Sequence, residues 1–305
     1  MITARGLTRS FGSLKAVDGL DLEVRKGEVF GFLGPNGAGK TTTVRMLAAL
    51  IAPTAGDAEV AGYTVGRQDD ALRAEVGVLT ETPGLYKRLS AFDNLAFFAK
   101  LHGVRDVAGS VERYLRLFEL WDRRNGLAGT FSKGMRQKLA IARALVHEPQ
   151  VLFLDEPTAG LDPEAAKTVR DLIESLRSKD RTIFLCTHNL DEADRLCDRV
   201  ALFKTRLITT GRPEELREQM YGQRTAVHIA NYRPGLEDEL RLPFVKHVEV
   251  VDGRLVVSLD DPATENPALV RRLVELGVEV QFVSELRVSL EDVYLDLMEG
   301  SHEPA

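Results

Sequence analysis

The stretch Gly34-Pro35-Asn36-Gly37-Ala38-Gly39-Lys40-Thr41 matches the phosphate-binding pattern G-x-x-x-x-G-K-[ST]. The pattern requires a strand before it and a helix after it, and the sequence predicts a buried strand over 28–33 and a helix over 42–50. Glycines let the backbone bend around an anion, so that successive N–H groups point inward at the positive end of the helix dipole. Lys40 adds a mobile cation, and Thr41 adds a hydroxyl oxygen that suits Mg²⁺. The stretch therefore predicts a site for a nucleoside triphosphate.

The composition of the whole chain is that of an ordinary globular protein. Its 305 residues, 44% of them hydrophobic, allow one large domain or two smaller ones. The formal net charge is −6, and no block of Lys and Arg stands out, so a broad nucleic-acid-binding surface is not indicated. The chain has only two cysteines, no apolar run of bilayer length and no signal-peptide pattern. We therefore expect it to work in the reducing cytoplasm and to reach a membrane only through a partner.

The segment from about residue 84 to residue 147 has the pattern of amphipathic helices. Helices are predicted over 90–102 and 107–120, and Ser132 is the predicted N-cap of a longer helix through residue 146. Because these helices stand between predicted strands, we expect them to form an insert in an α/β core.

Carboxylates and a histidine follow two of the predicted strands. The apolar strand over 151–154 leads into Asp155 and Glu156, the place where open α/β sheets bind their ligands. Buried carboxylates need a reason, and a metal ion supplies one. His188 follows the next buried strand, over 182–187. A lone histidine is usually structural, but this one lies at a strand end of the same sheet.

The spacing of elements changes after about residue 218. Strands are predicted at 225–230, 246–251, 254–259 and 278–283, and helices at 235–240 and 267–276. The order β-α-β-β-α-β predicts a small ferredoxin-like α+β domain over 219–305, with a tight turn at Asp252-Gly253. A terminal helix over 289–298 and a loose tail over 300–305 follow. We interpret His228 and His247 as ordinary strand residues, because no metal-ligand spacing surrounds them.

Several motifs stand in one order along the chain. The phosphate loop is followed by Ser132-Lys133-Gly134-Met135-Arg136-Gln137, the strand ending in Asp155 and Glu156, Ala159-Gly160-Leu161-Asp162, and His188. Over residues 1–218 this arrangement resembles the ATPase cassette of ABC transporters. The resemblance implies an α/β P-loop NTPase fold with a mixed core sheet, an antiparallel β layer and a helical subdomain over about 84–147.

Two segments resemble one branch of that family. They are the signature segment from Ser132 and the tail segment Ser289-Leu290-Glu291-Asp292-Val293-Tyr294, and both are similar to segments in the ATP-binding subunits of ABC-2 type multidrug and antibiotic exporters. This resemblance implies a peripheral protein on the inner face of the cell membrane. Its ATP hydrolysis would power the export of a drug, an antibiotic or a lipid-like substrate.

The resemblance also implies a role for individual residues. Phe11, in a predicted loop, would stack on adenine, although a lone Phe more often serves packing. The phosphates would be bound by Gly34, Pro35, Asn36, Gly37, Ala38, Gly39, Lys40, Thr41 and Thr42. Thr41 and Asp155 would hold Mg²⁺, and the catalytic residues would be Glu156, which orients or deprotonates the attacking water, with His188 and Lys40.

The resemblance further implies two protein partners and no nucleic acid. A second copy of the cassette would close onto this one when ATP is bound, offering Ser132, Gly134 and Asp162 to the ATP in trans. A separate transmembrane permease would be the other partner.

The chain departs from the family pattern at two positions. Glu81 stands where many cassettes have a glutamine that faces Mg²⁺. A carboxylate can still reach the metal, but it adds negative charge beside the γ-phosphate and cannot donate a hydrogen bond unless it is protonated. Phe131 replaces the usual leucine at the start of the signature, and we expect this change to affect packing only.

Other functions remain open at this stage. A soluble ABC ATPase that acts on ribosomes or DNA would usually carry paired cassettes or a long coiled coil, and neither is visible in the sequence. A different P-loop enzyme would not have the signature segment and His188, whereas an importer cassette differs only in finer features. The domain over 219–305 is either a regulatory or dimerising module or a structural cap. One amphipathic face is either a docking surface or the core of the helical insert, and its residues are Tyr86, Leu89, Phe92, Leu95 and Phe98.

Overall fold

The computed structural model describes residues 1–82, 84–178, 180–240, 242–251, 253–286 and 288–300. The chain divides into two units, Met1–Gly211 and Arg212–Ala305, and each is described by itself. The boundary predicted at residue 218 falls inside a helix, α8 (Pro213–Tyr221). The predicted turn residue Asp252 and the predicted tail beyond residue 300 lie outside the described residues.

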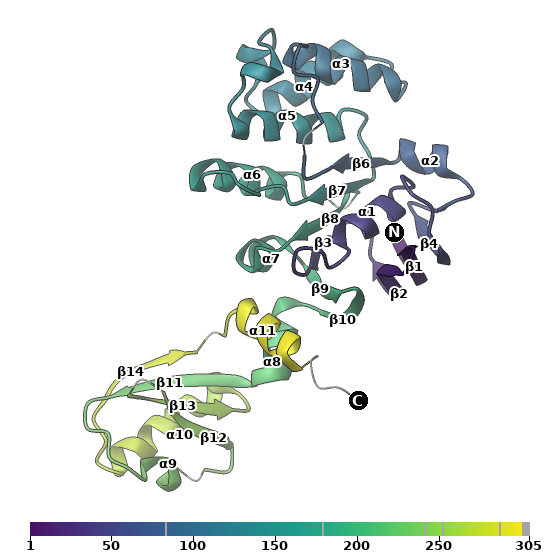
Figure 1. Ribbon diagram of the computed structural model, residues 1–305. Coiled ribbons are helices and arrows are strands. Elements are labelled where there is room, and N and C mark those ends of the chain that lie inside the picture. The colour runs from purple at the N-terminus through teal and green to yellow at the C-terminus, as the bar shows by residue number, and fades with distance from the viewer. Residues whose placement is uncertain (83, 179, 241, 252, 287, 301–305) are drawn as a thin grey trace. The chain divides into compact units, whose positions relative to one another are not determined.

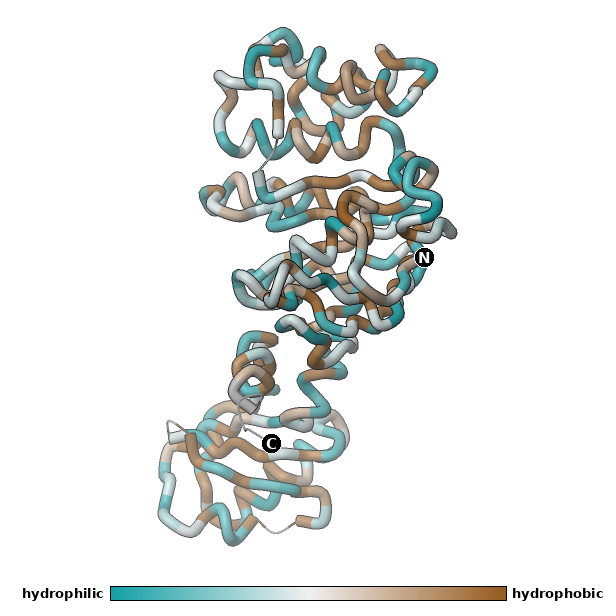
Figure 2. Tube along the Cα trace, turned by 45° about the vertical axis from the view of Figure 1, so that its right-hand side comes forward, coloured by the Kyte–Doolittle hydropathy of each residue, from teal (hydrophilic) through white to brown (hydrophobic). Residues whose placement is uncertain are grey.

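The first unit is built around a six-stranded mixed sheet. The strand order is β10-β9-β3-β8-β7-β6, and only β10 runs antiparallel to its neighbour. The strands are β3 (Val29–Leu33), β6 (Val76–Leu79), β7 (Val151–Asp155), β8 (Thr182–Thr187), β9 (Arg199–Lys204) and β10 (Arg206–Gly211). Every residue of β3, β7 and β8 is buried, as expected for parallel strands covered on both faces. Figure 2 shows the apolar character of this sheet as brown stretches along the tube.

Helices and a second sheet cover the mixed sheet. The second sheet is antiparallel, with the order β2-β1-β4-β5, and consists of β1 (Ile2–Phe11), β2 (Leu14–Val24), β4 (Ala55–Val60) and β5 (Tyr63–Thr64). One core joins this sheet and α1 (Lys40–Leu47) to the mixed-sheet face that carries Phe32, Phe153 and Phe184. The helices α6 (Pro163–Ser175) and α7 (Leu190–Leu196) lie on the other side of the mixed sheet (Figure 1).

The predicted helical insert stands between β6 and β7. It contains α3 (Ala91–Leu101), α4 (Val107–Leu117), two short 3₁₀ helices (Trp121–Arg123 and Ala128–Thr130) and α5 (Lys133–Leu145). The predicted cap of the last helix is confirmed, because the Ser132 side chain accepts a hydrogen bond from the N–H of Met135. A further short helix, α2 (Asp69–Ala74), precedes β6. Figure 1 shows α3, α4 and α5 grouped beyond the β6 edge of the mixed sheet.

The second unit confirms the predicted order of strands and helices. It runs β11 (Gln223–Ile229), α9 (Leu236–Glu239), β12 (Val245–Val251), β13 (Arg254–Leu259), α10 (Pro262–Glu275) and β14 (Val280–Glu285). The sheet order is β12-β13-β11-β14, with antiparallel neighbours throughout. Each β-α-β unit is therefore split by a strand of the other, which is the ferredoxin-like arrangement. The flanking helices α8 and α11 (Leu290–Gly300) contact each other.

Two predicted helix boundaries are wrong. The helix predicted over 267–276 begins at Pro262, because Asp261 caps it and Pro262 occupies its first turn, so Pro267 lies inside the helix. The helix predicted over 42–50 begins at Lys40 and ends at Leu47, since the chain turns at Ala49, where φ is 53°. None of the helices in the described ranges combines the length and the apolar composition needed to cross a bilayer.

Candidate functional site

The phosphate loop joins the end of β3 to the first residue of α1. A Cβ atom on Gly34 would lie 2.1 Å from the carbonyl oxygen of Phe203, and one on Gly39 would lie 2.2 Å from that of Ala16, so no side chain fits at either position. Gly39 also has φ of 106°. The Nζ of Lys40 lies back over the loop and donates to the carbonyl oxygen of Gly34 at 2.6 Å. The loop is therefore held in a tight curve from both sides.

Thr41 and Asp155 are brought together from α1 and β7. The hydroxyl of Thr41 donates to Oδ2 of Asp155 at 2.7 Å, although 114 residues separate them in sequence. Asp155 is almost fully buried, and its Oδ1 has no hydrogen-bond donor among the residues that the structure describes. Burial raises the pKa of Asp155, and the hydrogen bond from Thr41 opposes that rise. A buried carboxylate oxygen without a donor is suited to a divalent cation.

Glu156 occupies a sharp turn directly after β7. Its φ is 52°, in the left-handed region, and its N–H donates to the carbonyl oxygen of Cys186 at 2.9 Å. Its Oε1 lies 3.3 Å from Nζ of Lys40, and its Oε2 lies 2.8 Å from Nδ1 of His188. The turn therefore places the carboxylate between a lysine from the phosphate loop and a histidine from the neighbouring strand end.

These groups line one cavity of about 520 Å³. The cavity brings together most of the residues predicted for the site: Phe11, Pro35, Asn36, Gly37, Ala38, Gly39, Lys40, Thr41, Thr42, Glu81, Asp155, Glu156 and His188. Gly34, the first residue of the loop, is not part of this lining, and its carbonyl oxygen accepts a hydrogen bond from Nζ of Lys40. The lining also includes Ala159, the first residue of the Ala159-Gly160-Leu161-Asp162 motif, and Leu14 and Ala16, which carry no motif signal in the sequence.

Phe11 lines this cavity, and the prediction that it lies in a loop is wrong, because it is the last residue of β1. Its ring is 48% exposed, and the guanidinium of Arg9 lies 4.6 Å from the ring centroid. An exposed aromatic face beside a phosphate-binding loop can stack on a nucleobase.

Three predicted residues, Ser132, Gly134 and Asp162, lie outside this cavity lining. Ser132 caps α5, and the Asp162 side chain caps α6 by accepting from the N–H of Ala165 at 2.9 Å. A Cβ atom on Gly134 would lie 3.1 Å from the Cβ of Ala165, so the start of α5 packs closely on α6. The three residues therefore share a neighbourhood that is distinct from the cavity of their own chain.

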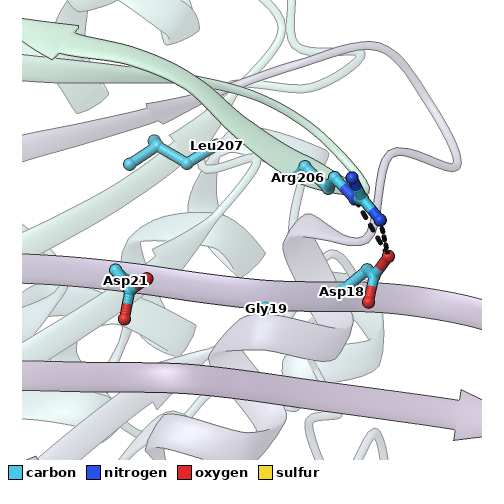
Figure 3. Close-up of a pocket in the computed structure, with 5 residues that line it drawn as sticks. All are labelled: Asp18, Gly19, Asp21, Arg206 and Leu207. Atoms are coloured by element: carbon cyan, nitrogen blue, oxygen red, sulfur yellow. Dashed lines mark hydrogen bonds and ion pairs between the residues drawn. The ribbon is translucent and has the colours of Figure 1, made fainter.

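A second cavity, of about 440 Å³, lies between β2 and β10. Figure 3 shows Arg206 pointing at Asp18, whose Oδ2 it contacts at 2.6 Å, with Asp21 further along β2. Hydrogen bonds from Arg206 and Lys15 lower the pKa of Asp18, and Asp21 accepts from the N–H of Gly6. Both carboxylates of this cavity therefore already have partners within the chain.

The predicted amphipathic face of the helical insert is divided by the structure. Leu95 is fully buried, so it belongs to the core of the helices and the docking interpretation is wrong for it. Tyr86 and Leu89 are exposed, and Tyr86 makes an edge contact with Phe97, whose ring is 46% exposed and was absent from the predicted set. The difference follows from the 3.6-residue period, which turns position 97 outward when position 95 turns inward.

Comparison with known proteins matches two family profiles to the chain. The family profile described as ABC transporter matches residues 17–159, and that of the C-terminal domain of DrrA1-3-like ATP-binding proteins matches residues 211–298. The daunorubicin resistance ATP-binding protein DrrA3 of Streptomyces coeruleorubidus is 39% identical over 303 residues, covering 97% of this chain and 95% of that protein. The Nod factor export ATP-binding protein I of Rhizobium sp. (strain N33) is 35% identical over 307 residues, covering 97% and 96%.

A solved ATP-binding subunit of an ABC transporter has the same cassette fold. It superposes with a TM-score of 0.66 at 30% identity, covering 73% of this chain and 94% of that one. The fold and the site thus define a P-loop ATPase cassette of the ABC type. The chain belongs to the family of ABC transporter ATP-binding subunits, and its C-terminal domain is of the DrrA-like kind.

Proposed function

We propose that this protein binds and hydrolyses ATP to power a membrane exporter of a drug, an antibiotic or a lipid-like substrate. The observation that carries the proposal is the convergence of Lys40, Glu156 and His188 in the cavity that the phosphate loop lines. The similarity to proteins named for drug resistance and for Nod factor export extends over nearly the full chain, which supports export over import.

Thr41 and Asp155 are the residues that would hold Mg²⁺, with Glu81 beside them. The unsatisfied Oδ1 of Asp155 and the adjacent hydroxyl of Thr41 fit an ion that prefers one or two protein oxygens alongside phosphate oxygens and water. Glu81 lines the same cavity and adds a further negative charge. When bound, the ion neutralises charge on the β- and γ-phosphates.

Glu156 would orient or deprotonate the water that attacks the γ-phosphate. Its side chain is only 11% exposed, so the backbone turn and the contacts with Lys40 and His188 hold it in place. His188 holds one carboxylate oxygen and is itself 55% exposed, so its ring can also reach a phosphate oxygen. The role of these residues is alignment and charge stabilisation, which supply most of the acceleration in phosphoryl transfer. Phe11 would hold the adenine ring at the mouth of the cavity.

Catalysis would require a second copy of the chain. Ser132 and Gly134 stand at the N-terminus of α5, which is 13 residues long, and they do not line the cavity of their own chain. A helix N-terminus attracts phosphate oxygens. Two cassettes facing each other would therefore each offer this turn, with Asp162 nearby, to the ATP of the partner. The cassette in this proposal spans residues 1–218, and residues 219–305 form an accessory domain.

The membrane partner would be a separate permease that docks on the helical insert. The exposed aromatic residues Tyr86 and Phe97 would supply an apolar surface for this docking. Glu81 lines the nucleotide cavity and precedes Tyr86 by five positions, so Glu81 would report the state of the nucleotide site to the permease. In this arrangement the protein lies on the inner face of the membrane and contacts no nucleic acid.

Affinity purification from gently solubilised membranes of the native cell, combined with ATPase assays, tests the proposal. We expect a stoichiometric hydrophobic protein with about six predicted spans, together with ATP hydrolysis that Glu156→Gln abolishes. Recovery of ribosomes or DNA in its place would favour a soluble ABC ATPase, and a binding-protein-dependent uptake system would favour an importer.

A further inference from the structure

The loop between β7 and α6, residues 156–162, is fastened to α5 by two side chains. The Nζ of Lys133 donates to the carbonyl oxygen of Gly160 at 2.7 Å, and Nε2 of Gln137 donates to that of Pro157 at 2.7 Å. Lys133 is the first residue of α5, and Gln137 follows it by four residues, so both project from the same helix face. The two hydrogen bonds span the loop that starts with Glu156.

The two bonds add to the hydrogen bonds that the loop makes within itself. Its own backbone contributes two turns, from Ala159 N–H to Glu156 and from Leu161 N–H to Thr158, and these leave the Pro157 and Gly160 carbonyls to α5. Gln137 is 6% exposed, so its bond is shielded from water. Gly160 has φ of 63°, and a Cβ atom there would lie 2.3 Å from Nζ of Lys133. The glycine thus leaves room for the ammonium group.

Resting on the proposed function, we infer that Lys133 and Gln137 are positioning residues that couple the first turn of α5 to Glu156. That turn, which Ser132 caps, is where the ATP of the partner copy would bind. Glu156, at the start of the fastened loop, acts on the ATP of its own chain and is held on its other side by the carbonyl oxygen of Cys186. A displacement of α5 by the partner's ATP therefore reaches Glu156 through short hydrogen bonds within one chain.

Lys133 has one competing role that the test must separate. Its ammonium group is exposed at the start of α5, so it could instead bind a phosphate of the partner's ATP. A phosphate ligand contributes to ATP-driven dimerisation even when Glu156 is replaced. A positioning residue acts on Glu156, so its loss lowers turnover and leaves the dimerisation of a Glu156→Gln protein unchanged.

The experiment uses the full chain with Lys133→Met, Lys133→Arg and Gln137→Met. Lys138→Met is the matched control, because Lys138 lies on the same helix but pairs with Glu119, away from the loop. Turnover at saturating Mg²⁺-ATP is measured for each, and the ATP concentration that half-converts monomer to dimer is measured in the Glu156→Gln background. We expect Lys133→Met and Gln137→Met to lower turnover at least about fivefold, as for loss of a buried or charged hydrogen bond. Lys133→Arg should restore at least half of the wild-type turnover. In the Glu156→Gln background, the ATP concentration for half-conversion to dimer should change by no more than about twofold when Lys133→Met or Gln137→Met is added.

Either of two results overturns the inference. If Lys133→Met turns over like Lys138→Met, the bond to Gly160 does not position Glu156. If Lys133→Met raises the half-conversion concentration tenfold or more, the ammonium group is a phosphate ligand. A wild-type protein that hydrolyses no ATP, alone or with its membrane partner, contradicts the proposed function itself, and the wild-type and Lys138→Met proteins reveal that before any loop variant is compared.

Discussion

The Nζ of Lys40 lies 3.3 Å from Oε1 of Glu156, in a pair whose side chains are only 6% and 11% exposed. ATP must take Glu156's place as the partner of Lys40, and the carboxylate repels the phosphates that arrive. We therefore expect Glu156→Gln to bind Mg²⁺-ATP about three- to tenfold more tightly, while losing at least about 100-fold in turnover. The ATP-bound protein should accumulate as a dimer.

Equilibrium binding of a fluorescent ATP analogue, steady-state phosphate release and gel filtration measure these effects. Glu148→Gln is a suitable control, since Glu148 pairs with Arg113 on the surface. Turnover near the wild-type value in Glu156→Gln would mean that another group orients the water.

Lys40→Ala should weaken nucleotide binding itself. Lys40 is 6% exposed and bonds the Gly34 carbonyl, so its ammonium group stands inside the curve of the phosphate loop. Removing a desolvated cation from a phosphate site costs about 2–3 kcal/mol, or roughly 30- to 150-fold in the dissociation constant. Titration calorimetry with ATP is the measurement, and Lys26→Ala, which removes an exposed lysine paired with Asp180, is the control. Equal affinity in the two variants would contradict the phosphate-site assignment.

Ser132→Arg should block dimerisation without harming ATP binding by the monomer. Ser132 is exposed and caps α5, and a bulky cation there fills the space that the partner's ATP would occupy. Loss of the cap costs about 1 kcal/mol, so Ser132→Ala separates the capping effect from the steric one. We expect no dimer of Ser132→Arg in the Glu156→Gln background by light scattering, and hydrolysis near background. A fully active Ser132→Arg protein would rule out the trans arrangement.

The sequence could predict that Asp155 and His188 lie close together, because their positions follow the topology of the sheet. Asp155 is the last residue of β7 and His188 comes directly after β8, and the carboxyl ends of parallel strands meet at one sheet edge. The order of the C-terminal strands was predictable for a similar reason, since short apolar runs and turns mark each element.

What the sequence could not predict depends on packing between distant segments. The left-handed backbone of Glu156 and its pairing with both Lys40 and His188 arise only when β7 and β8 are aligned. Leu14 lines the nucleotide cavity together with the phosphate loop and the ends of β7 and β8, and no pattern in its own strand indicates that distant lining. The Lys133 bond to Gly160 is likewise a contact between an insert and the core.

Glu81→Gln should relax the dependence of nucleotide binding on Mg²⁺. Glu81 shares a cavity with Asp155 and Glu156, so three carboxylates face a phosphate site that contains Lys40. Removing one negative charge favours free ATP over the neutralised Mg²⁺ complex, by about 1 kcal/mol at an effective dielectric constant well above that of dry protein. The ratio of ATP dissociation constants in EDTA and in Mg²⁺ should then fall about fivefold. An unchanged ratio would show that Glu81 lies too far from the metal to act on it.

The stability of the cassette should fall in mild acid because of His147. Its ring stacks on that of His102 with centroids 3.8 Å apart, and its Nε2 lies 3.1 Å from the carbonyl oxygen of Val76. Burial, reinforced by His102, lowers the pKa of His147 to about 4. An unfolded histidine titrates near 6.5, so between these values the unfolded chain binds the extra proton, and the contribution of His147 to stability is lost as the pH falls through that window. From pH 7 to pH 5 this amounts to about 2 kcal/mol. Urea unfolding at both pH values measures the free energy of unfolding. Between pH 7 and pH 5 this free energy should fall by about 2 kcal/mol less in His147→Gln than in the wild type. An equal fall in the two proteins would mean that the ring of His147 is solvated and titrates normally.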